Sequence, residues 1–460
     1  MKVSLLLCLG LGLTLLITSC TQSPKTTGGN GSSLSAACQT AIGLSSQPAG
    51  LNPVMAPALL TGQAVTTGPG TQTAPDWAAP HVAGEVLVIG SGQLSAQATS
   101  RLSGLKLTPV ATGVQRAETP GGQTDQAFAR TLRAAGLNVQ PNFIYHALGM
   151  VDDPGFPGNS GLLVGQFKMF QTYLTRTRVP QAWNTLAICG LTPQGALTAM
   201  VDTPLDSAHS ELKNRITVGA ARLPAATGTG HGTAGAGLIA ANTNNGSGLS
   251  GIVWNAQLLS EEVLAADGGT TSQIALGIDD AVSRGARVIN LSLGEPGNSG
   301  DTVLTNSILK AQQSAVVVVA AGNRPDQGVY YPANLPGVIA VGSTGSSDSA
   351  LACYSARPGN GIDRTLDIVA PGGAGYEGGC DGATLDQDLL LLAPNNSYIL
   401  DAGTSFAAPQ VSAVAALMRA ANPKLTASQT RALLIGSVNW ASGLPLLDAN
   451  AAVKAALRAN

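Results

Sequence analysis

The sequence predicts a three-layer α/β protein with a mostly parallel central sheet, preceded by a small α+β unit. Almost continuous apolar runs such as 315–320 indicate strands that are buried on both faces. Helical patterns lie between these runs, such as the apolar face made by Ile274, Ile278, Ala281 and Val282. Strands that alternate with helices in this way favour a parallel sheet covered by helices on both sides.

The composition bounds the number of domains and the class of partner. A chain of 460 residues is too long for one ordinary domain and suggests two or three units. Hydrophobic residues make up 44%, which is enough for a sizeable core, and charged residues only 11%. Because the net charge is −2 and Lys and Arg form no cluster, we expect no nucleic-acid partner.

The first twenty residues have the pattern of an export signal. Lys2 supplies the positive start, and 5–17 is an apolar stretch that is short for a stable membrane span. It ends in the string ITSC at 17–20, which resembles the lipobox of bacterial lipoproteins and implies a lipid on Cys20. An ordinary secretory signal with a chance cysteine is the alternative. Both interpretations predict an exported protein, either lipid-anchored in the bacterial cell envelope or secreted.

Four cysteines remain once the signal is removed and Cys20 is lipidated, namely Cys38, Cys189, Cys353 and Cys380. In an oxidising compartment we expect them to pair. We favour Cys353 with Cys380, because both flank one loop region, and Cys38 with Cys189 would then tie the N-terminal segment to the body. The sequence leaves this connectivity open. No spacing of Cys and His resembles a zinc site, and we predict no metal in the reaction.

Two segments separate the signal from the main domain. Residues 21–80 are rich in Ser, Thr, Gly, Pro and Gln, and this composition predicts a flexible tether. Residues 81–147 have strand patterns at 85–89, 105–110 and 137–145 and a helical pattern at 124–135. The second segment is therefore the predicted small α+β unit.

We assign residues 160–460 to one large α/β domain. An apolar run at 197–201 ends at Asp202, and further strand patterns follow at 287–291, 338–341 and 366–369. The end of the chain is helical, with a capping box in which Gln429 follows Thr426 by three residues.

The string GTSFAAP at 403–409 supplies a candidate nucleophile, Ser405. The downstream apolar face at Val411, Val414, Ala415 and Met418 indicates a helix, and Pro409 is acceptable in a first turn. Ser405 would then lie at a helix start, where backbone N–H groups are free and a developing negative charge is stabilised. A serine there is more often only a helix cap, so the whole string carries the argument.

His231 and Asp202 supply a base and a group to orient it. His231 lies in the string GHGT at 230–233, before a run of small residues that indicates another helix start. The other histidines, His81, His146 and His209, lack such a setting. Asp202 ends a strand, and catalytic groups in open α/β sheets gather at the carboxyl ends of strands. A turn aspartate is the common alternative, but the order Asp, His, Ser is that of subtilisin.

Asn323 is a candidate donor to an oxyanion. It follows the strand pattern at 315–320 through the turn Ala321-Gly322, and its amide could act together with the N–H of Ser405. A turn asparagine is again the alternative interpretation.

Taken together, these motifs resemble the subtilase family of serine peptidases over residues 160–460. The strings INLSLG at 289–294, YPA at 331–333 and APG at 370–372 extend the resemblance. It implies a subtilisin-like fold and a triad in which His231 is the base, Asp202 fixes its tautomer and Ser405 forms an acyl-enzyme. It also implies that Ser292, Leu293 and Gly294 pair with the backbone of the substrate.

The α+β unit resembles the inhibitory pro-domain of subtilases. The matching strings are GEVLV at 84–88 and QPNFIY at 140–145. This resemblance predicts a precursor that cuts itself near residues 147–165. The alternative is an accessory domain that is never removed.

Three residues depart from the usual pattern of the family. Pro204 stands where Gly is usual after the acid, and its fixed φ would alter that turn. Gln410 stands where His is common, and Tyr330 stands where small residues often open the pocket for the substrate side chain at the scissile bond. We expect these changes to affect rate and specificity more than activity itself.

The family also binds calcium. Glu211 and Asn244 lie near the expected ligands, and their oxygens suit this ion. The loop at 242–248 is equally consistent with an ordinary polar loop, so calcium is expected for structure at most and not for the chemistry.

The sequence thus predicts an exported, monomeric serine endopeptidase that acts on protein or peptide substrates. A catalytically silent, peptide-binding lipoprotein of the same fold is the main alternative, motivated by Pro204. An esterase is the other, and the absence of a Gly-x-Ser-x-Gly string around Ser405 argues against it.

Overall fold

The computed structural model describes residues 34–44, 75, 77, 81–89, 104–143, 151–223, 230–297, 300–376 and 379–459. The signal at 1–20 and most of the segment at 21–80 lie outside them. Among the described residues, no helix is both long enough and apolar enough to cross a bilayer.

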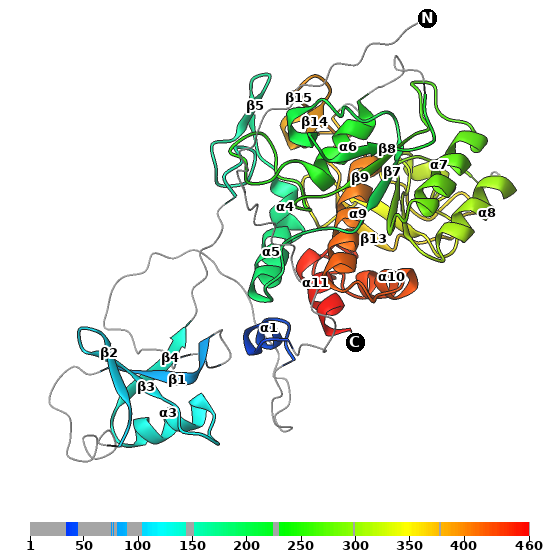
Figure 1. The fold of residues 1–460 in the computed structure, drawn as a ribbon. Helices are drawn as coiled ribbons and strands as arrows, with labels where there is room; N and C mark the ends of the chain where they lie inside the picture. The colour runs from blue at the N-terminus through cyan, green and yellow to red at the C-terminus, as the bar shows by residue number, and fades with distance from the viewer. Residues whose placement is uncertain are drawn as a thin grey trace, which may run out of the picture. The chain divides into compact units, whose positions relative to one another are not determined.

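A small α+β unit forms from residues 81–143 (Figure 1). Its antiparallel sheet has the order β2-β3-β1-β4, and one helix, α3, packs against it. The bounds are β1 His81–Ile89, β2 Leu107–Ala111, β3 Val114–Glu118, α3 Asp125–Ala134 and β4 Asn138–Phe143. Thr124 caps α3 by accepting the N–H of Ala127, as its residue type favours. The expected elements are present, and β3 is one strand more than the sequence indicated.

The centre of the large domain is a seven-stranded sheet in which every neighbouring pair is parallel. Its order is β13-β12-β11-β10-β7-β9-β8. The bounds are β7 Thr198–Asp202, β8 Ile216–Val218, β9 Leu258–Glu262, β10 Val288–Leu291, β11 Val316–Ala320, β12 Ile339–Thr344 and β13 Ile368–Pro371. All residues of β11 are buried, which explains its continuous apolar sequence.

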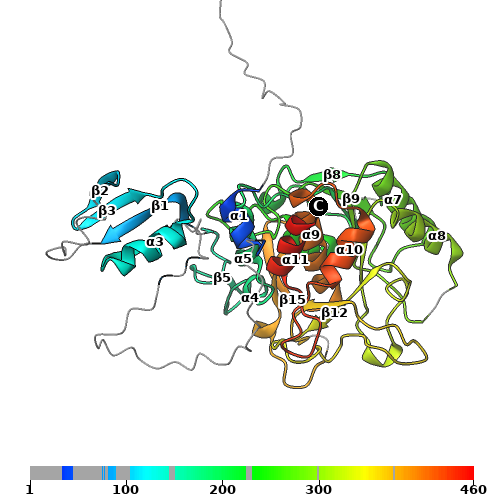
Figure 2. The same cartoon turned by 90° about the horizontal axis from the view of Figure 1, so that it is seen from below.

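Helices cover the two faces of this sheet. On one face, Ile289 and Leu291 share a core cluster with Ile278 of α7 and Ile308 of α8, two helices that lie side by side in Figures 1 and 2. On the other face, Asn290 accepts a 2.9 Å hydrogen bond from Ser412 of α9. Alternate residues of one strand therefore face different helical layers. The bounds are α6 His231–Ala240, α7 Thr271–Ser283, α8 Thr302–Ala311 and α9 Thr404–Ala421. The predicted three-layer α/β fold is confirmed.

Shorter elements surround these layers. Two hairpins are formed by β5 Leu162–Val164 with β6 Phe167–Met169 and by β14 Leu389–Ala393 with β15 Ser397–Asp401. Further α-helices of the described large domain are α4 Thr172–Arg176, α5 Val179–Ile188, α10 Ala427–Ile435 and α11 Ala449–Arg458, and 3₁₀ turns occur at Ser210–Leu212, Pro325–Gln327 and Leu385–Gln387. Figure 2 shows α9, α10 and α11 together, and they contact one another. Thr426 and Gln429 form the predicted capping box at the start of α10.

The N-terminal segment is not a tether throughout its length. Residues Ala36–Ala41 form the helix α1, which contacts α5 and is joined to it by the disulfide Cys38–Cys189. A second disulfide joins Cys353 to Cys380. Both favoured pairings are therefore confirmed, whereas the prediction of a flexible tether over 21–80 is wrong for the residues around Cys38.

Candidate active site

The three predicted catalytic side chains lie at the ends of three elements. Asp202 is the last residue of β7, His231 is the first residue of α6, and Ser405 is the second residue of α9. The carboxyl ends of parallel strands meet at one edge of the sheet, and helix starts offer free N–H groups there.

Asp202 and His231 form a direct contact. Oδ1 of Asp202 lies 2.7 Å from Nδ1 of His231 and also accepts the N–H of Thr203. Asp202 is only 1% exposed, and its Oδ2 has no hydrogen-bond partner among the described residues. The charge of Asp202 raises the pKa of His231 against the opposing effect of burial, and Asp401 adds a smaller rise. With its proton on Nδ1, the imidazole presents a free Nε2 that can accept another proton.

Two glycines explain how the local sequence brings His231 to this position. Gly230 has a φ of +82°, a conformation that favours glycine. A Cβ added at Gly232 would lie 2.4 Å from the carbonyl oxygen of Thr203, so only glycine permits this close approach. The N–H of Gly232 donates to the hydroxyl of Thr203 at 2.8 Å, which joins the start of α6 to the residue after Asp202.

Ser405 is held by Ser292. Pro409 is the sixth residue of α9, beyond the first turn, so it removes the backbone N–H that would donate to the carbonyl of Ser405. The hydroxyl of Ser292 donates to this carbonyl instead, at 2.8 Å. The expectation that Pro409 lies in the first turn is therefore wrong, and Ser292 replaces the missing donor.

Among the described residues, no hydrogen bond joins the hydroxyl of Ser405 to His231. The hydroxyl donates to the carbonyl of Ser292 at 3.5 Å, its one hydrogen bond within the described chain. The ring of the next residue, Phe406, lies 5.4 Å from the His231 ring between centroids. Hydrogen bonds between a nucleophile and its base are often long before substrate binds, so this geometry is compatible with catalysis.

Asn323 is oriented by Thr404. Its side-chain oxygen accepts the backbone N–H and the hydroxyl of Thr404, each at 2.9 Å, which turns its NH₂ group the other way. A Cβ added at Gly403 would lie 3.3 Å from Nδ2 of Asn323 and 3.7 Å from the backbone N of Ser405. The two expected oxyanion donors therefore border the same small space.

The predicted substrate-binding segment follows β10. Glu295 exchanges two backbone hydrogen bonds with Tyr331, which fixes one side of this segment. The backbones of Leu293 and Gly294 form no hydrogen bond to the rest of the described chain. Together with Ser292 they present backbone groups that an extended peptide can pair with.

Comparisons with known proteins identify the family of the chain. Residues 193–455 match the Subtilase family. The chain belongs to this family. It is 35% identical to subtilisin BL of Lederbergia lenta over 294 residues, which cover 61% of this chain and 97% of the relative. It is 33% identical to thermitase of Thermoactinomyces vulgaris over 276 residues, which cover 58% of this chain and 88% of the relative. A protease of Pseudoalteromonas arctica has a similar structure, with a TM-score of 0.51, 30% identity, and coverage of 61% of this chain and 94% of the protease. The subtilase is accordingly a serine endopeptidase.

Two departures from the family pattern leave the site geometry intact. Pro204 follows Thr203, yet the Asp202–His231 contact beside it is 2.7 Å long. Gln410 is buried and donates to the carbonyls of Pro371 and Phe406, so its role in the subtilase is to join α9 to β13.

The third departure, Tyr330, occupies space next to the site. A Cβ added at Gly322 would lie 2.4 Å from the Tyr330 ring, so the ring rests directly on this glycine. Gly322 immediately precedes Asn323, and a Cβ at Gly294 would lie 3.4 Å from Cβ of Tyr330. Tyr330 thus lies between the turn at Gly322-Asn323 and the substrate-binding segment. Burial raises the pKa of its hydroxyl.

The calcium ligands expected near Glu211 fit only in part. Both carboxylate oxygens of Glu211 are buried without a well-formed hydrogen bond, and burial raises its pKa to about 7. Asn245, Ser247 and the backbone of Leu249 face the carboxylate and favour its charged form. Asn244 does not face it in the same way, because its side-chain oxygen accepts the N–H of Asp152 at 3.2 Å. The described residues hold no group of three or more His, Cys, Asp or Glu side chains that suits a metal.

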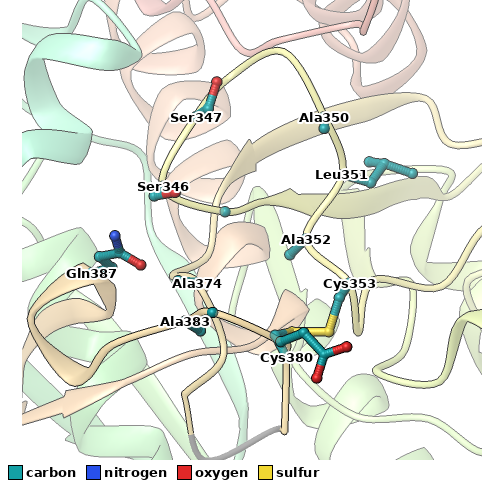
Figure 3. Close-up of a pocket in the computed structure, with 13 residues that line it drawn as sticks. Ser346, Ser347, Ala350, Leu351, Ala352, Cys353, Ala374, Cys380, Ala383 and Gln387 are labelled. Atoms are coloured by element: carbon teal, nitrogen blue, oxygen red, sulfur yellow. A yellow bond between two sulfur atoms is a disulfide. The ribbon is translucent and has the colours of Figure 1, made fainter.

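Two residues that act on the site, Thr404 and Asp401, were not predicted from the sequence, and His209 lies in a setting unlike that of His231, as expected. Thr404 and Asp401 act on Asn323 and His231, and only their positions just before Ser405 could have indicated this. His209 is buried in a structural turn, where its Nδ1 accepts the N–H of Glu211. The Cys353–Cys380 disulfide and residues of the loop at 345–352 line a surface pocket, and no triad residue is part of its lining (Figure 3).

Proposed function

We propose that the subtilase hydrolyses peptide bonds through Asp202, His231 and Ser405. The observation that carries this proposal is the 2.7 Å contact between Asp202 and His231, together with the position of Ser405 as the second residue of α9. In this mechanism Nε2 of His231 takes the proton of the Ser405 hydroxyl as its oxygen attacks the scissile carbonyl. Asp202 stabilises the imidazolium that forms, and His231 then gives the proton to the leaving amine.

The negative oxygen of the tetrahedral intermediate is stabilised by two donors. They are Nδ2 of Asn323 and the backbone N–H of Ser405, which border one space and need no rearrangement. Collapse of the intermediate leaves an acyl group on Ser405. Water activated by His231 then hydrolyses this ester and restores the free enzyme.

Substrate selection at the scissile bond depends on Tyr330. An extended substrate that pairs with Ser292–Gly294 and directs its carbonyl to Asn323 points the side chain of its scissile residue between these two segments. The Tyr330 ring fills part of that space. The enzyme therefore prefers small scissile residues such as Ala or Gly to large ones such as Phe.

The arrangement of the chain supports maturation by self-cleavage before residue 151. From Val151 onward the chain is fixed to the large domain, since Asp153 is fully buried and accepts the N–H groups of Asn244 and Asn245. The α+β unit ends with β4 at Phe143. A cut within 144–150 would separate the two without disrupting either, and it overlaps the range of 147–165 expected from the sequence at residues 147–150.

Export, lipidation of Cys20 and calcium binding complete the proposal. The segment at 1–20 supports export and anchoring in the cell envelope. Glu211, together with oxygens from the loop that contains Asn245 and Ser247, would hold a calcium ion. The ion would neutralise the buried carboxylate and stabilise the fold, without a part in the reaction.

Labelling with a fluorophosphonate tests the triad. The probe should label the processed wild-type enzyme and not the Ser405→Ala variant, because only an activated serine reacts with it. A folded and processed wild type that takes no label would contradict the proposal and favour the silent peptide-binding alternative. Self-cleavage is tested separately, since Ser405→Ala should remain a single chain when no other protease is present.

A further inference from the structure

The segment upstream of the α+β unit is part of the large domain. Cys38 and Ile42 are both fully buried, although they lie more than a hundred residues before β7. Cys38 is bonded to Cys189, the residue that caps the C-terminal end of α5. This segment is thus attached covalently to the large domain, although it precedes the proposed cut within 144–150 in the sequence.

Non-covalent contacts accompany the disulfide. The guanidinium of Arg458, at the end of α11, donates to the backbone carbonyl of Ile42. Gly43 has a φ of +74°, and a Cβ there would lie 2.9 Å from a nitrogen of Arg458. Ser35 caps α1 by accepting the N–H of Cys38 at 3.1 Å. The segment therefore has a folded binding site of its own and is more than a cysteine on a loose chain.

We propose that the mature enzyme consists of two chains joined by the Cys38–Cys189 disulfide. The inference rests on the proposed cut within 144–150, which lies between these two cysteines in the sequence. Hydrolysis there produces a new carboxylate and a new amine but leaves the disulfide unchanged. The N-terminal chain, with any lipid on Cys20, consequently stays attached to the catalytic domain after the precursor has been cut.

The disulfide also determines how the catalytic domain can be released. Its formation transfers two electrons and two protons from the thiols to a disulfide oxidant of the oxidising compartment. A dithiol reductant returns them, is itself oxidised to a cyclic disulfide, and frees Cys38 and Cys189. The Cys353–Cys380 disulfide cannot hold the two chains together, because both of its cysteines lie after the cut.

Gel analysis of the full-length protein with and without reductant tests the inference. The chain carries a C-terminal tag, is produced in a lipoprotein-processing host, and is treated with N-ethylmaleimide to block thiol exchange. Antibodies to the tag and to residues 21–33 should detect one common band without dithiothreitol and two separate bands with it. Dithiothreitol should also move the tagged chain from the membrane fraction to the soluble one. A cleaved enzyme whose tagged chain runs alone without reductant would overturn the proposal.

Two variants provide the controls. Cys38→Ser should give separate chains without reductant, whereas the double variant Cys353→Ser/Cys380→Ser should behave like the wild type. If Cys38→Ser fails to fold, reduction of the folded wild type still supplies the comparison.

Failure of self-cleavage would be recognised as one full-length band under both conditions. In that case a recognition site for an unrelated endopeptidase is inserted between residues 146 and 147 of Ser405→Ala. The two fragments made by that endopeptidase should stay together until dithiothreitol is added. Fragments that separate without reductant would refute the attachment independently of the enzyme's own activity.

Discussion

The hydroxyl of Ser292 donates a 2.8 Å hydrogen bond to the backbone carbonyl of Ser405. In an uninterrupted helix this carbonyl would accept the N–H of residue 409, which is a proline here. The substrate-binding segment is therefore joined to the nucleophile through a bond that the helix itself cannot supply.

This relationship predicts an energetic coupling between Ser292 and Pro409. In a Ser405→Ala background, which prevents autolysis, Ser292→Ala should lower the free energy of unfolding by about 1–3 kcal/mol, because a partly buried carbonyl loses its donor. Pro409→Ala restores an N–H at position 409, so Ser292→Ala should cost about 1 kcal/mol less in that background. Denaturant unfolding of the four variants measures the coupling. Strictly additive costs would contradict it.

Thr404 should influence turnover through Asn323. Thr404→Val removes the hydroxyl that donates to the Asn323 side chain and keeps the backbone donor. We expect kcat to fall about 3–10-fold at nearly constant KM, well below the 10²–10³-fold loss measured in subtilisin when the oxyanion asparagine itself is removed. Thr404→Ser should restore the wild-type rate. A KM effect alone would indicate that Thr404 does not act through the oxyanion donors.

The pH dependence of activity should respond to Asp401. His231 must be neutral to accept the serine proton, so activity is lost as the pH falls through its pKa. Asp202 and, less strongly, Asp401 raise this pKa. Asp401→Asn removes one of these charges, and the acidic limb of kcat/KM should therefore move to lower pH. Asp267→Asn, an exposed position outside the site, should leave the profile unchanged.

Tyr330 should limit the size of the scissile residue. Tyr330→Ala empties the space on Gly322 that the ring fills. We expect the ratio of kcat/KM for a Phe substrate to that for an Ala substrate to rise by about 10–100-fold, the range that differences in apolar fit produce. Tyr376→Ala serves as the control, because Tyr376 is 52% exposed. An unchanged ratio would mean that the scissile side chain binds elsewhere.

Glu211 should make stability depend on calcium and pH. Burial raises its pKa to about 7, so the metal-free folded state holds its proton more strongly than the unfolded state, in which the pKa is ordinary. This contribution to stability is full below the unfolded pKa and is lost as the pH rises toward 7, by about 2–4 kcal/mol in total. Calcium should offset the loss at pH 8.

The matched variant for that experiment is Glu211→Gln. Its amide cannot ionise, so its melting temperature without calcium should fall less than that of the wild type as the pH rises, and it should not respond to calcium. Melting curves of both proteins in calcium and in a chelator, with Ser405→Ala to prevent autolysis, make the comparison. A wild type insensitive to calcium at pH 8 would exclude the ion from this position.

The sequence predicted the layers of the fold because buried parallel strands carry a strong local signal. Runs such as Val316–Ala320 are apolar throughout, and a strand buried on both faces requires this pattern. The helix α1 carried no such signal, because six residues of mixed character form a stable helix here only through contacts with α5 and a disulfide to distant Cys189.

The site residues that could be predicted from the sequence are those that lie at the end of a strand or the start of a helix. Asp202, His231 and Ser405 have this property, and their strings could be recognised locally. The contact that replaces the missing N–H of Pro409 joins residues more than a hundred positions apart, so no local pattern reveals it. The contact of Asn244 was hidden for a similar reason, since the Asp152 N–H that donates to its side chain lies far away in the sequence.

The order of the central sheet has a consequence for how fast the domain folds and unfolds. Its parallel pairs are all connected by long crossovers, and β9 inserts between β7 and β8, which precede it in the chain. A topology of such high contact order is assembled slowly, because chain entropy is lost before distant strands can pair. Because refolding is slow, a copy that opens can be cleaved by the endopeptidase before it closes again. The lifetime of this protein then depends on how rarely it unfolds more than on its equilibrium stability.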